Sequence, residues 1–432
     1  MRKFLTLLAV ILLSAPALFA QKEYGLKFSS LINDNLTLEN AIRIGLENNT
    51  DFLAAKEEII IAEQRVQEAK FLFLPQFSVQ GTATLYDLDY PTVLPESVAN
   101  RFIPDSKSLG NEDQFYGVGI SATQYLYSGG RLNNTLKIAR ANLKQVQSKY
   151  DTVKNAVVLN IKKAFINLLY AQYEEDLSQS VLEKAERYYQ ALRLSAWEKV
   201  QARAILSSLA SNRSSAVSNL KKAELNMLVA LNKELNAKIK VEGEFKPVKL
   251  SLDLPHLNLW SMEFRPELKS AIYALELDNI AIDLALSRRY PDVILTGSYE
   301  QLGFDNLNDV NKQVSLAVRF PLPYTLGTQF KQKKAEQKQS ALKRSAMEDK
   351  IHVQVAESFE NMLFWQTEVL DRQEAFNEVA ALLKEAEKFP KTGVTPLQAL
   401  AAYRQTASDY YEGIKNNLSS KAALEWAIGQ DL

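Results

Sequence analysis

The chain has 432 residues, and its 51 Lys and Arg residues balance 51 Asp and Glu residues, so the formal net charge is zero. A balanced charge argues against nucleic-acid binding, which needs a basic face. The absence of cysteine excludes disulfides, thiolate metal sites, a cysteine nucleophile and a lipid anchor on an N-terminal cysteine. Glycine (15) and proline (13) are sparse, which favours long regular elements over loops.

The first twenty residues are typical of a secretory signal peptide. Arg2 and Lys3 precede a mostly apolar run from Phe4 to Phe19, which is too short for a good transmembrane helix. We expect cleavage after Ala20, with cleavage after Ala17 as the close alternative and an uncleaved anchor as the less favoured one. The exported chain is then either soluble outside the cytoplasm or inserted in a membrane as β-strands.

An internal repeat organises the rest of the chain. Superposing Asp51 on Glu267 aligns two stretches of the chain without a gap. Each stretch runs from the start of a predicted helix, across a proline, into a predicted strand. The matched pairs include Ala55 with Ala271, Val66 with Ile282, Pro75 with Pro291, and Gly81 with Gly297. We therefore expect a signal peptide at 1–20, a first structural repeat with its linker at 21–260, and a second repeat at 261–432.

Each repeat contains two stretches in which apolar and polar residues alternate, the mark of strands with one apolar and one polar face. The strands are expected at about 76–86, 115–126, 291–300 and 313–321. If they enter a membrane, their apolar face meets lipid. The residues predicted to face lipid are Phe77, Val79, Ala83, Leu85, Val118, Ile120, Val293, Leu295, Val314, Leu316 and Val318.

Very long helices are predicted after each pair of strands, at about 131–232 and 329–429. No glycine or proline occurs between Arg131 and Glu242, or from Thr328 to Phe389. In the first of these stretches apolar residues recur in alternating steps of four and three from Leu132 onward, which is a heptad seam. The predicted fold is mainly α with membrane β-strands, built from a duplicated helix–strand–strand–helix–helix unit whose long helices form a coiled-coil tube.

Four strands cannot close a membrane barrel, because the smallest such barrels have eight. Two chains would give eight strands with a filled interior, and three would give twelve strands with room for a lumen. If the protein is a duct, it is therefore at least a trimer. The alternative is a small periplasmic sheet packed on helices, in a periplasmic or surface coiled-coil scaffold without a membrane barrel.

Five short motifs follow one another along the chain. They are L-T-L-E-N-A at 36–41, L-P-Q-F at 74–77, Y-S-G-G-R at 127–131, R-P-E-L at 265–268 and A-L-E-W-A-I-G at 423–429. Their order, together with the duplication, resembles TolC-type outer-membrane efflux proteins over nearly the whole mature chain.

The resemblance implies a homotrimer in the outer membrane of a Gram-negative bacterium, with a shared twelve-stranded barrel and a helical tunnel in the periplasm. Such a channel belongs to a tripartite efflux or type I secretion system. It is a passive duct that receives substrates from a periplasmic adaptor (membrane fusion) protein and an inner-membrane transporter.

The resemblance also assigns functional positions. Gly129, Gly130 and Arg131 form the turn from strand to long helix. The periplasmic tip and adaptor contact comprise Arg193, Ser195, Trp197, Glu198, Lys391, Thr392, Gly393 and Val394. Glu387 and Lys388 are candidate gating charges. At the first tip turn Leu192 stands where the family usually carries glycine, which weakens the assignment of the adaptor contact.

Candidate chemistry is sparse. No serine, histidine and carboxylate set can be identified from spacing, so an exported hydrolase is disfavoured. His256 is expected in a loop, and the spacing of His352 and Glu357 is more typical of a solvated helix face than of a metal site. We therefore expect no enzyme activity, no catalytic residues, no cofactor, no metal and no nucleic-acid partner.

Overall fold

The computed structural model describes residues 36–85, 114–191, 194–237, 239–303, 307, 309–321, 324–388 and 392–432. The predicted signal peptide lies outside these ranges. The helices are α2 (Leu38–Asn48), α3 (Thr50–Phe71), α5 (Arg131–Ala191), α6 (Ala196–Ala230), α7 (Leu254–Phe264), α8 (Pro266–Ser287), α9 (Leu326–Ala386) and α10 (Thr395–Ile428). The strands are β1 (Gln76–Leu85), β2 (Gln114–Tyr127), β3 (Asp292–Gly303) and β4 (Asp309–Arg319).

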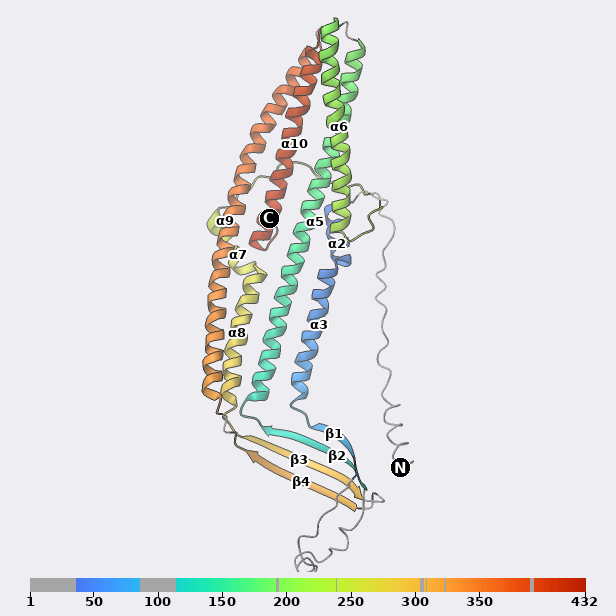
Figure 1. The fold of residues 1–432 in the computed structure, drawn as a ribbon. Helices are drawn as coiled ribbons and strands as arrows, with labels where there is room; N and C mark the ends of the chain where they lie inside the picture. Colours follow the sequence, from blue (N-terminus) through green and yellow to red (C-terminus); the bar gives the residue numbers. More distant parts are fainter. Residues whose placement is uncertain are drawn as a thin grey trace, which may run out of the picture.

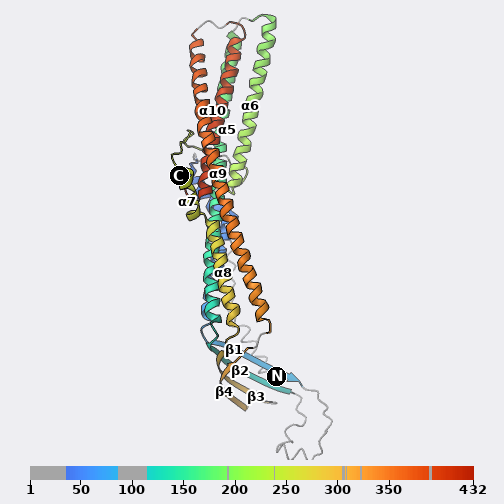
Figure 2. The ribbon, with the colours of Figure 1, turned by 90° about the vertical axis from the view of Figure 1, so that its left-hand side faces the viewer.

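The body is elongated, with the sheet at one end and the turns between the longest helices at the other end, called the tip below (Figure 1). Near the sheet, neighbouring helices follow the order α3, α5, α8, α9; near the tip the order is α6, α5, α10, α9. The body stays slender when seen from the side (Figure 2). Within the described ranges, no helix is both long and apolar enough to cross a bilayer.

The internal repeat is visible in the helix lengths. α3 and α8 both have 22 residues, and α5 and α9 both have 61 residues. Each repeat runs from a short helix through two strands into a long helix and back along a second helix. The predicted fold class, a duplicated helix–strand–strand–helix–helix unit, is therefore confirmed.

Local sequence explains where the helices begin and end. The Asn49 side chain accepts a hydrogen bond of 2.9 Å from the Phe52 N–H, which caps α3. At the end of α10, Gly429 adopts φ 80° and closes the helix in the left-handed conformation that glycine tolerates best. α3 buries only small side chains, those of Ala55, Ala62, Val66 and Ala69. Their size lets α3 lie close to α5.

All four strands pair antiparallel in the order β1-β2-β3-β4. Residues paired across neighbouring strands point to the same face. Because Val79 pairs with Ile120, and Ile120 with Tyr299, the apolar positions of β1, β2 and β3 share one face. The pairs of Leu295 with Leu316 and of Val293 with Val318 extend this face onto β4.

The buried apolar side chains form three clusters along the body. One lies around Ile161, Leu168 and Met227, a second near the tip around Leu397 and Leu400, and a third around Ile351 and Leu424. The first two clusters join segments of both repeats, so the two halves of the chain are packed as one unit. The third packs Leu257 of α7 against helices of the second repeat.

The structure also corrects and extends the predicted elements. His256 lies in the first turn of α7 and contacts Asp253, whose side chain caps this helix, so its assignment to a loop was wrong. α2 and α7 were not predicted as helices, because each has only 11 residues. β4 begins at Asp309, earlier than predicted, and β3 continues to Gly303.

Candidate functional site

The sheet has one apolar and one polar face. The predicted lipid-facing residues whose side chains are described occupy the same face, and Phe77, Val79 and Val314 are 73%, 67% and 82% exposed. Leu85 is the last residue of β1. On the opposite face the hydroxyls of Ser78 and Ser121 lie 2.7 Å apart. The two faces of the sheet therefore differ in polarity.

The turn from β2 into α5 is formed by the predicted Gly129, Gly130 and Arg131. Gly129 and Gly130 have φ values of 60° and 86°, in the region that favours glycine. A Cβ atom on Gly129 would lie 2.6 Å from the Cβ of Tyr290, so only glycine lets this turn approach the end of α8 so closely.

Asp292 fixes the same junction. Its carboxylate is buried at the start of β3 and accepts hydrogen bonds from Arg131 (2.6 Å) and Arg319 (2.9 Å). These arginines begin α5 and end β4, so one carboxylate joins a long helix to two strands. Asp292 was not recognised in the sequence, and its only local signal is the position directly after Pro291.

A second cluster joins the start of α8 to the end of α10. The buried guanidinium of Arg265 donates to Glu267 (2.9 Å), to Gln354 (3.0 Å) and to the carbonyl of Ala427 (2.9 Å). It also lies 4.5 Å from the ring centre of Trp426. The R-P-E-L and A-L-E-W-A-I-G motifs therefore meet in space, where arginine satisfies carbonyl groups at a helix C-terminus.

α5 and α6 form one helical hairpin, and α9 and α10 form the other. Between these two hairpins, Glu174 of α5 forms an ion pair with Arg404 of α10. Both side chains are largely buried, and burial raises the pKa of the Glu174 carboxyl, while the charge of Arg404 opposes that rise. Because each partner comes from a different repeat, this pair couples the two hairpins on the tip side of the body. Neither residue was singled out in the sequence.

At the tip the two turns lie against each other. Ser195 and Glu198 form a capping box at the start of α6. Gly393, with φ 63°, lies in the other turn and approaches the start of α6 closely. A Cβ atom on Gly393 would lie 3.1 Å from the Glu198 carboxylate. Thr392 and Val394 flank this glycine, with Val394 at the N-cap of α10. Arg193 and Lys391 lie outside the described residues.

Trp197 and the two candidate gating charges differ in their surroundings. Trp197 is 83% exposed, which is unusual for so large an apolar side chain. Glu387, just after α9, contacts Lys184 and accepts a 2.8 Å hydrogen bond from Tyr188, both on α5. Lys388, the other candidate gating charge, is exposed.

Burial, and then the hydrogen bond to Glu387, raise the pKa of Tyr188 to about 12. The phenol therefore stays protonated at physiological pH and acts as the donor. Lys184 and Tyr188 were missed because the pairing of α5 with the end of α9 depends on how the long helices cross.

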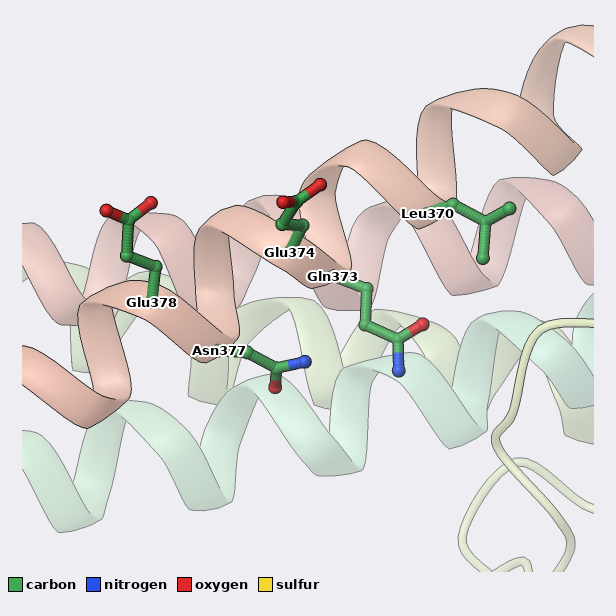
Figure 3. A pocket seen from close by; sticks show the side chains of 5 residues that line it. All are labelled: Leu370, Gln373, Glu374, Asn377 and Glu378. Carbon is green, nitrogen blue, oxygen red and sulfur yellow. The ribbon is translucent and has the colours of Figure 1, made fainter.

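A hollow of about 570 Å³ lies beside α9 between the tip and the middle of the body, and one helix lines it (Figure 3). Its lining residues are Leu370, Gln373, Glu374, Asn377 and Glu378. The side chains of Glu374 and Glu378 project to the same side of α9 (Figure 3). The lining gives this side of α9 a polar and acidic character.

The comparisons with known proteins agree with this architecture. Residues 41–196 match the outer membrane efflux protein family. No curated protein matches the sequence of the chain.

Three solved structures share the fold. The open state of the Neisseria gonorrhoeae MtrE outer membrane channel is 18% identical, with a TM-score of 0.74 over 91% of this chain and 89% of that chain. The Campylobacter jejuni CmeC outer membrane channel is 16% identical, with a TM-score of 0.72 over 91% of this chain and 85% of that chain. The outer membrane protein VceC from Vibrio cholerae is 13% identical, with a TM-score of 0.72 over 91% of this chain and 96% of that chain. Over its length the chain therefore shares the fold of these structures, and its residues 41–196 are similar to the outer membrane efflux protein family.

Proposed function

We propose that three copies of this chain form an outer-membrane channel-tunnel of a Gram-negative bacterium. The channel is a passive duct in a tripartite efflux or type I secretion system, and it carries no catalytic step. A periplasmic adaptor and an inner-membrane transporter deliver the substrate. The observation that carries the proposal is the two-faced sheet, whose outer strands β1 and β4 each pair on one side only within the described part of the chain.

The two open edges support closure between copies. Unpaired strand edges are unfavourable in lipid, because no water satisfies their N–H and C=O groups. Joining β4 of one copy to β1 of the next removes the edges, and three copies give a twelve-stranded barrel. The apolar face would then meet lipid and the polar face would line a lumen. The proposal agrees with the names of MtrE and CmeC as outer membrane channels.

The test is purification from outer membranes followed by reconstitution in planar bilayers. We expect an oligomer that migrates as a trimer until it is heated, and discrete single-channel conductance steps from the unheated protein. A detergent-solubilised protein that is monomeric, with no heat-sensitive oligomer and no conductance, would contradict the proposal and favour the scaffold alternative.

The tip is proposed as the gate and the adaptor contact. Trp197, Glu198, Gly393 and Val394 belong to the two turns that end the body, where an adaptor can meet them (Figure 1). The contact of Glu387 with α5 holds the end of α9 to the other hairpin. Opening is then a two-state change in which the α9–α10 hairpin moves away from α5, and the adaptor biases it.

Replacing Glu387 with alanine is expected to favour the open tip. Losing the contacts to Lys184 and Tyr188 costs about 1–2 kcal/mol per copy, because one is a charged hydrogen bond and the other a partly exposed ion pair. The ratio of open to closed tips should rise about 5–30-fold in each copy, and by more for a whole channel if its three copies open together. Single-channel recordings of the reconstituted variant measure this ratio.

The matched control is Glu385→Ala, which removes an exposed carboxylate two residues earlier, in the last turn of α9. It should leave the recordings unchanged. Equal open probabilities for Glu387→Ala and the parent channel would show that this contact does not hold the tip closed.

A further inference from the structure

The apolar face of the sheet carries one charged side chain within the described strands, that of Lys312 on β4. Lys312 pairs with Tyr299 of β3 and lies on the same face as Val314 and Leu316. Its side chain is exposed and forms no ion pair with any described residue. A charge on a face that meets lipid is unfavourable and is a mark of function.

Polar groups gather around this lysine. The Lys312 ammonium lies 5.7 Å from the centre of the Tyr299 ring. The side-chain amide of Gln301, the next residue of β3 on this face, donates a 3.2 Å hydrogen bond to the Tyr299 hydroxyl. Because the hydroxyl accepts this bond, its own proton can be donated to a further group. The ammonium and the hydroxyl can therefore donate together to one anion.

The position of this polar group in the sheet indicates which anion it meets. β3 starts beside the end of α8 and runs away from the helices (Figure 1). Tyr299 is seven residues beyond Asp292, so in a tilted strand that rises about 2.4 Å per residue it stands roughly 17 Å above this junction. The apolar band of a membrane barrel is about 25 Å tall. Lys312 thus lies in the outer half of the band, where a lysine stem can carry its ammonium to the headgroups.

The sheet surface beside this polar group is open. Gly297 of β3 pairs with Ala122 of β2 and with Val314 of β4. A Cβ atom on Gly297 would meet no heavy atom within 4 Å apart from its own chain neighbours. The row of apolar side chains is therefore interrupted between Leu295 and Tyr299. An acyl chain can lie in this gap.

We propose that Lys312, Tyr299 and the gap at Gly297 form a binding site for the phosphorylated glycolipid of the outer leaflet. The lipid phosphate accepts hydrogen bonds from the Lys312 ammonium and the Tyr299 hydroxyl, and one acyl chain lies over Gly297. This inference rests on the proposed outer-membrane channel and names a lipid ligand for its barrel. Each copy provides one site.

The neighbouring strands supply no anion for Lys312. In the proposed barrel β4 lies beside β1 of the next copy, and β1 reads QFSVQGTATL, without a charged residue. Glu300, next to Tyr299 in the chain, points to the polar face, where its carboxylate accepts a 3.3 Å hydrogen bond from Gln80. Lipid phosphates are the anions at the height of Lys312, and basic side chains at a membrane surface attract such headgroups.

Native mass spectrometry of the detergent-solubilised trimer tests the site, with purified lipid A as the probe. We expect the parent to retain up to one lipid A molecule per copy, and to retain far less lipid A whose phosphates have been removed. Lys312→Gln should lower the bound fraction about five-fold or more, because a charged hydrogen bond is lost. Lys312→Arg keeps the charge and should keep the binding. The matched control is Lys343→Gln, which removes an exposed lysine of α9 and should bind like the parent.

Filling the gap tests the acyl-chain part of the site without changing any charge. Gly297→Leu places its side chain in open space, so it should assemble, but it should lower the retention of lipid A about five-fold. Val293→Leu enlarges a side chain at the helix end of the same face and serves as the matched control. Every variant is first checked for the heat-sensitive trimer, which separates lost binding from misfolding.

The outcomes distinguish the lipid site from the proposed function. Equal retention of lipid A by the parent and Lys312→Gln would overturn the site, and so would equal retention of lipid A with and without its phosphates. Displacement of lipid A by excess inorganic phosphate would show a site for phosphate alone and overturn the lipid assignment. These results would leave the conducting trimer intact. A parent protein with no oligomer and no conductance would instead defeat the channel proposal itself.

Discussion

Replacing Val79 or Leu295 with arginine is expected to block assembly of the protein in the outer membrane. Both residues lie on the apolar face of the sheet. Val79 pairs with Ile120 near the middle of β1. An arginine facing lipid costs about 2–4 kcal/mol at the bilayer midplane and less toward the interfaces. In a trimer each substitution is repeated three times around the barrel, so the total cost is comparable to the stability of a whole domain.

The measurement is the amount of heat-sensitive trimer recovered from isolated outer membranes, compared with total protein. The matched control is Ser298→Arg, on the polar face of β3, where a charge would point into water. We expect the control to assemble and the two apolar-face variants to be lost or retained in the periplasm. Normal assembly of both Val79→Arg and Leu295→Arg would show that this face does not meet lipid.

Most of the architecture could be predicted from the sequence because its signals are periodic. Alternation from Phe77 to Leu85 identifies a strand, and the antiparallel register then places the apolar residues of all four strands on one face. The absence of glycine and proline predicted long helices, and α5 and α9 each reach 61 residues. Periodic patterns are repeated many times, so single exceptions do not obscure them.

The contacts that hold the elements together could not be predicted in the same way. Asp292 binds Arg131, which is distant from it in the sequence, and Arg319, which lies across the β3–β4 hairpin. Tyr188 meets Glu387 only because the end of α9 crosses toward α5. Such contacts depend on how helices and strands are placed in space, and no local spacing of residues encodes that placement.

Arg265 is an intermediate case between the periodic elements and the long-range contacts. Its motif was recognisable in the sequence, but its contacts required the structure. Its side chain is 3% exposed and joins the start of α8 to the C-terminal end of α10. Gly429 follows α10 at this point, and a Cβ there would lie 3.0 Å from the carbonyl carbon of Phe264. The R-P-E-L and A-L-E-W-A-I-G motifs therefore pack against each other in the fold.

Replacing Arg265 with alanine is expected to lower the free energy of unfolding by about 3–5 kcal/mol. The change leaves Glu267, Gln354 and the Ala427 carbonyl without their shared donor in a site that water hardly reaches. Arg265→Lys keeps the charge but loses the planar fork that donates in three directions, so it should recover only part of the loss. Urea unfolding of the solubilised protein, followed by circular dichroism, measures these differences.

Arg288→Ala is the matched control, because Arg288 is exposed at the end of α8 and bonds Gln329 at 3.0 Å. It should change the free energy of unfolding by no more than about 0.5 kcal/mol. If Arg265→Ala were as mild as Arg288→Ala, the junction of α8 with α10 would be held by the apolar cluster around Leu424 alone. The ranking of alanine, lysine and parent at position 265 therefore decides whether hydrogen bonds or apolar packing joins the end of the second repeat to its beginning.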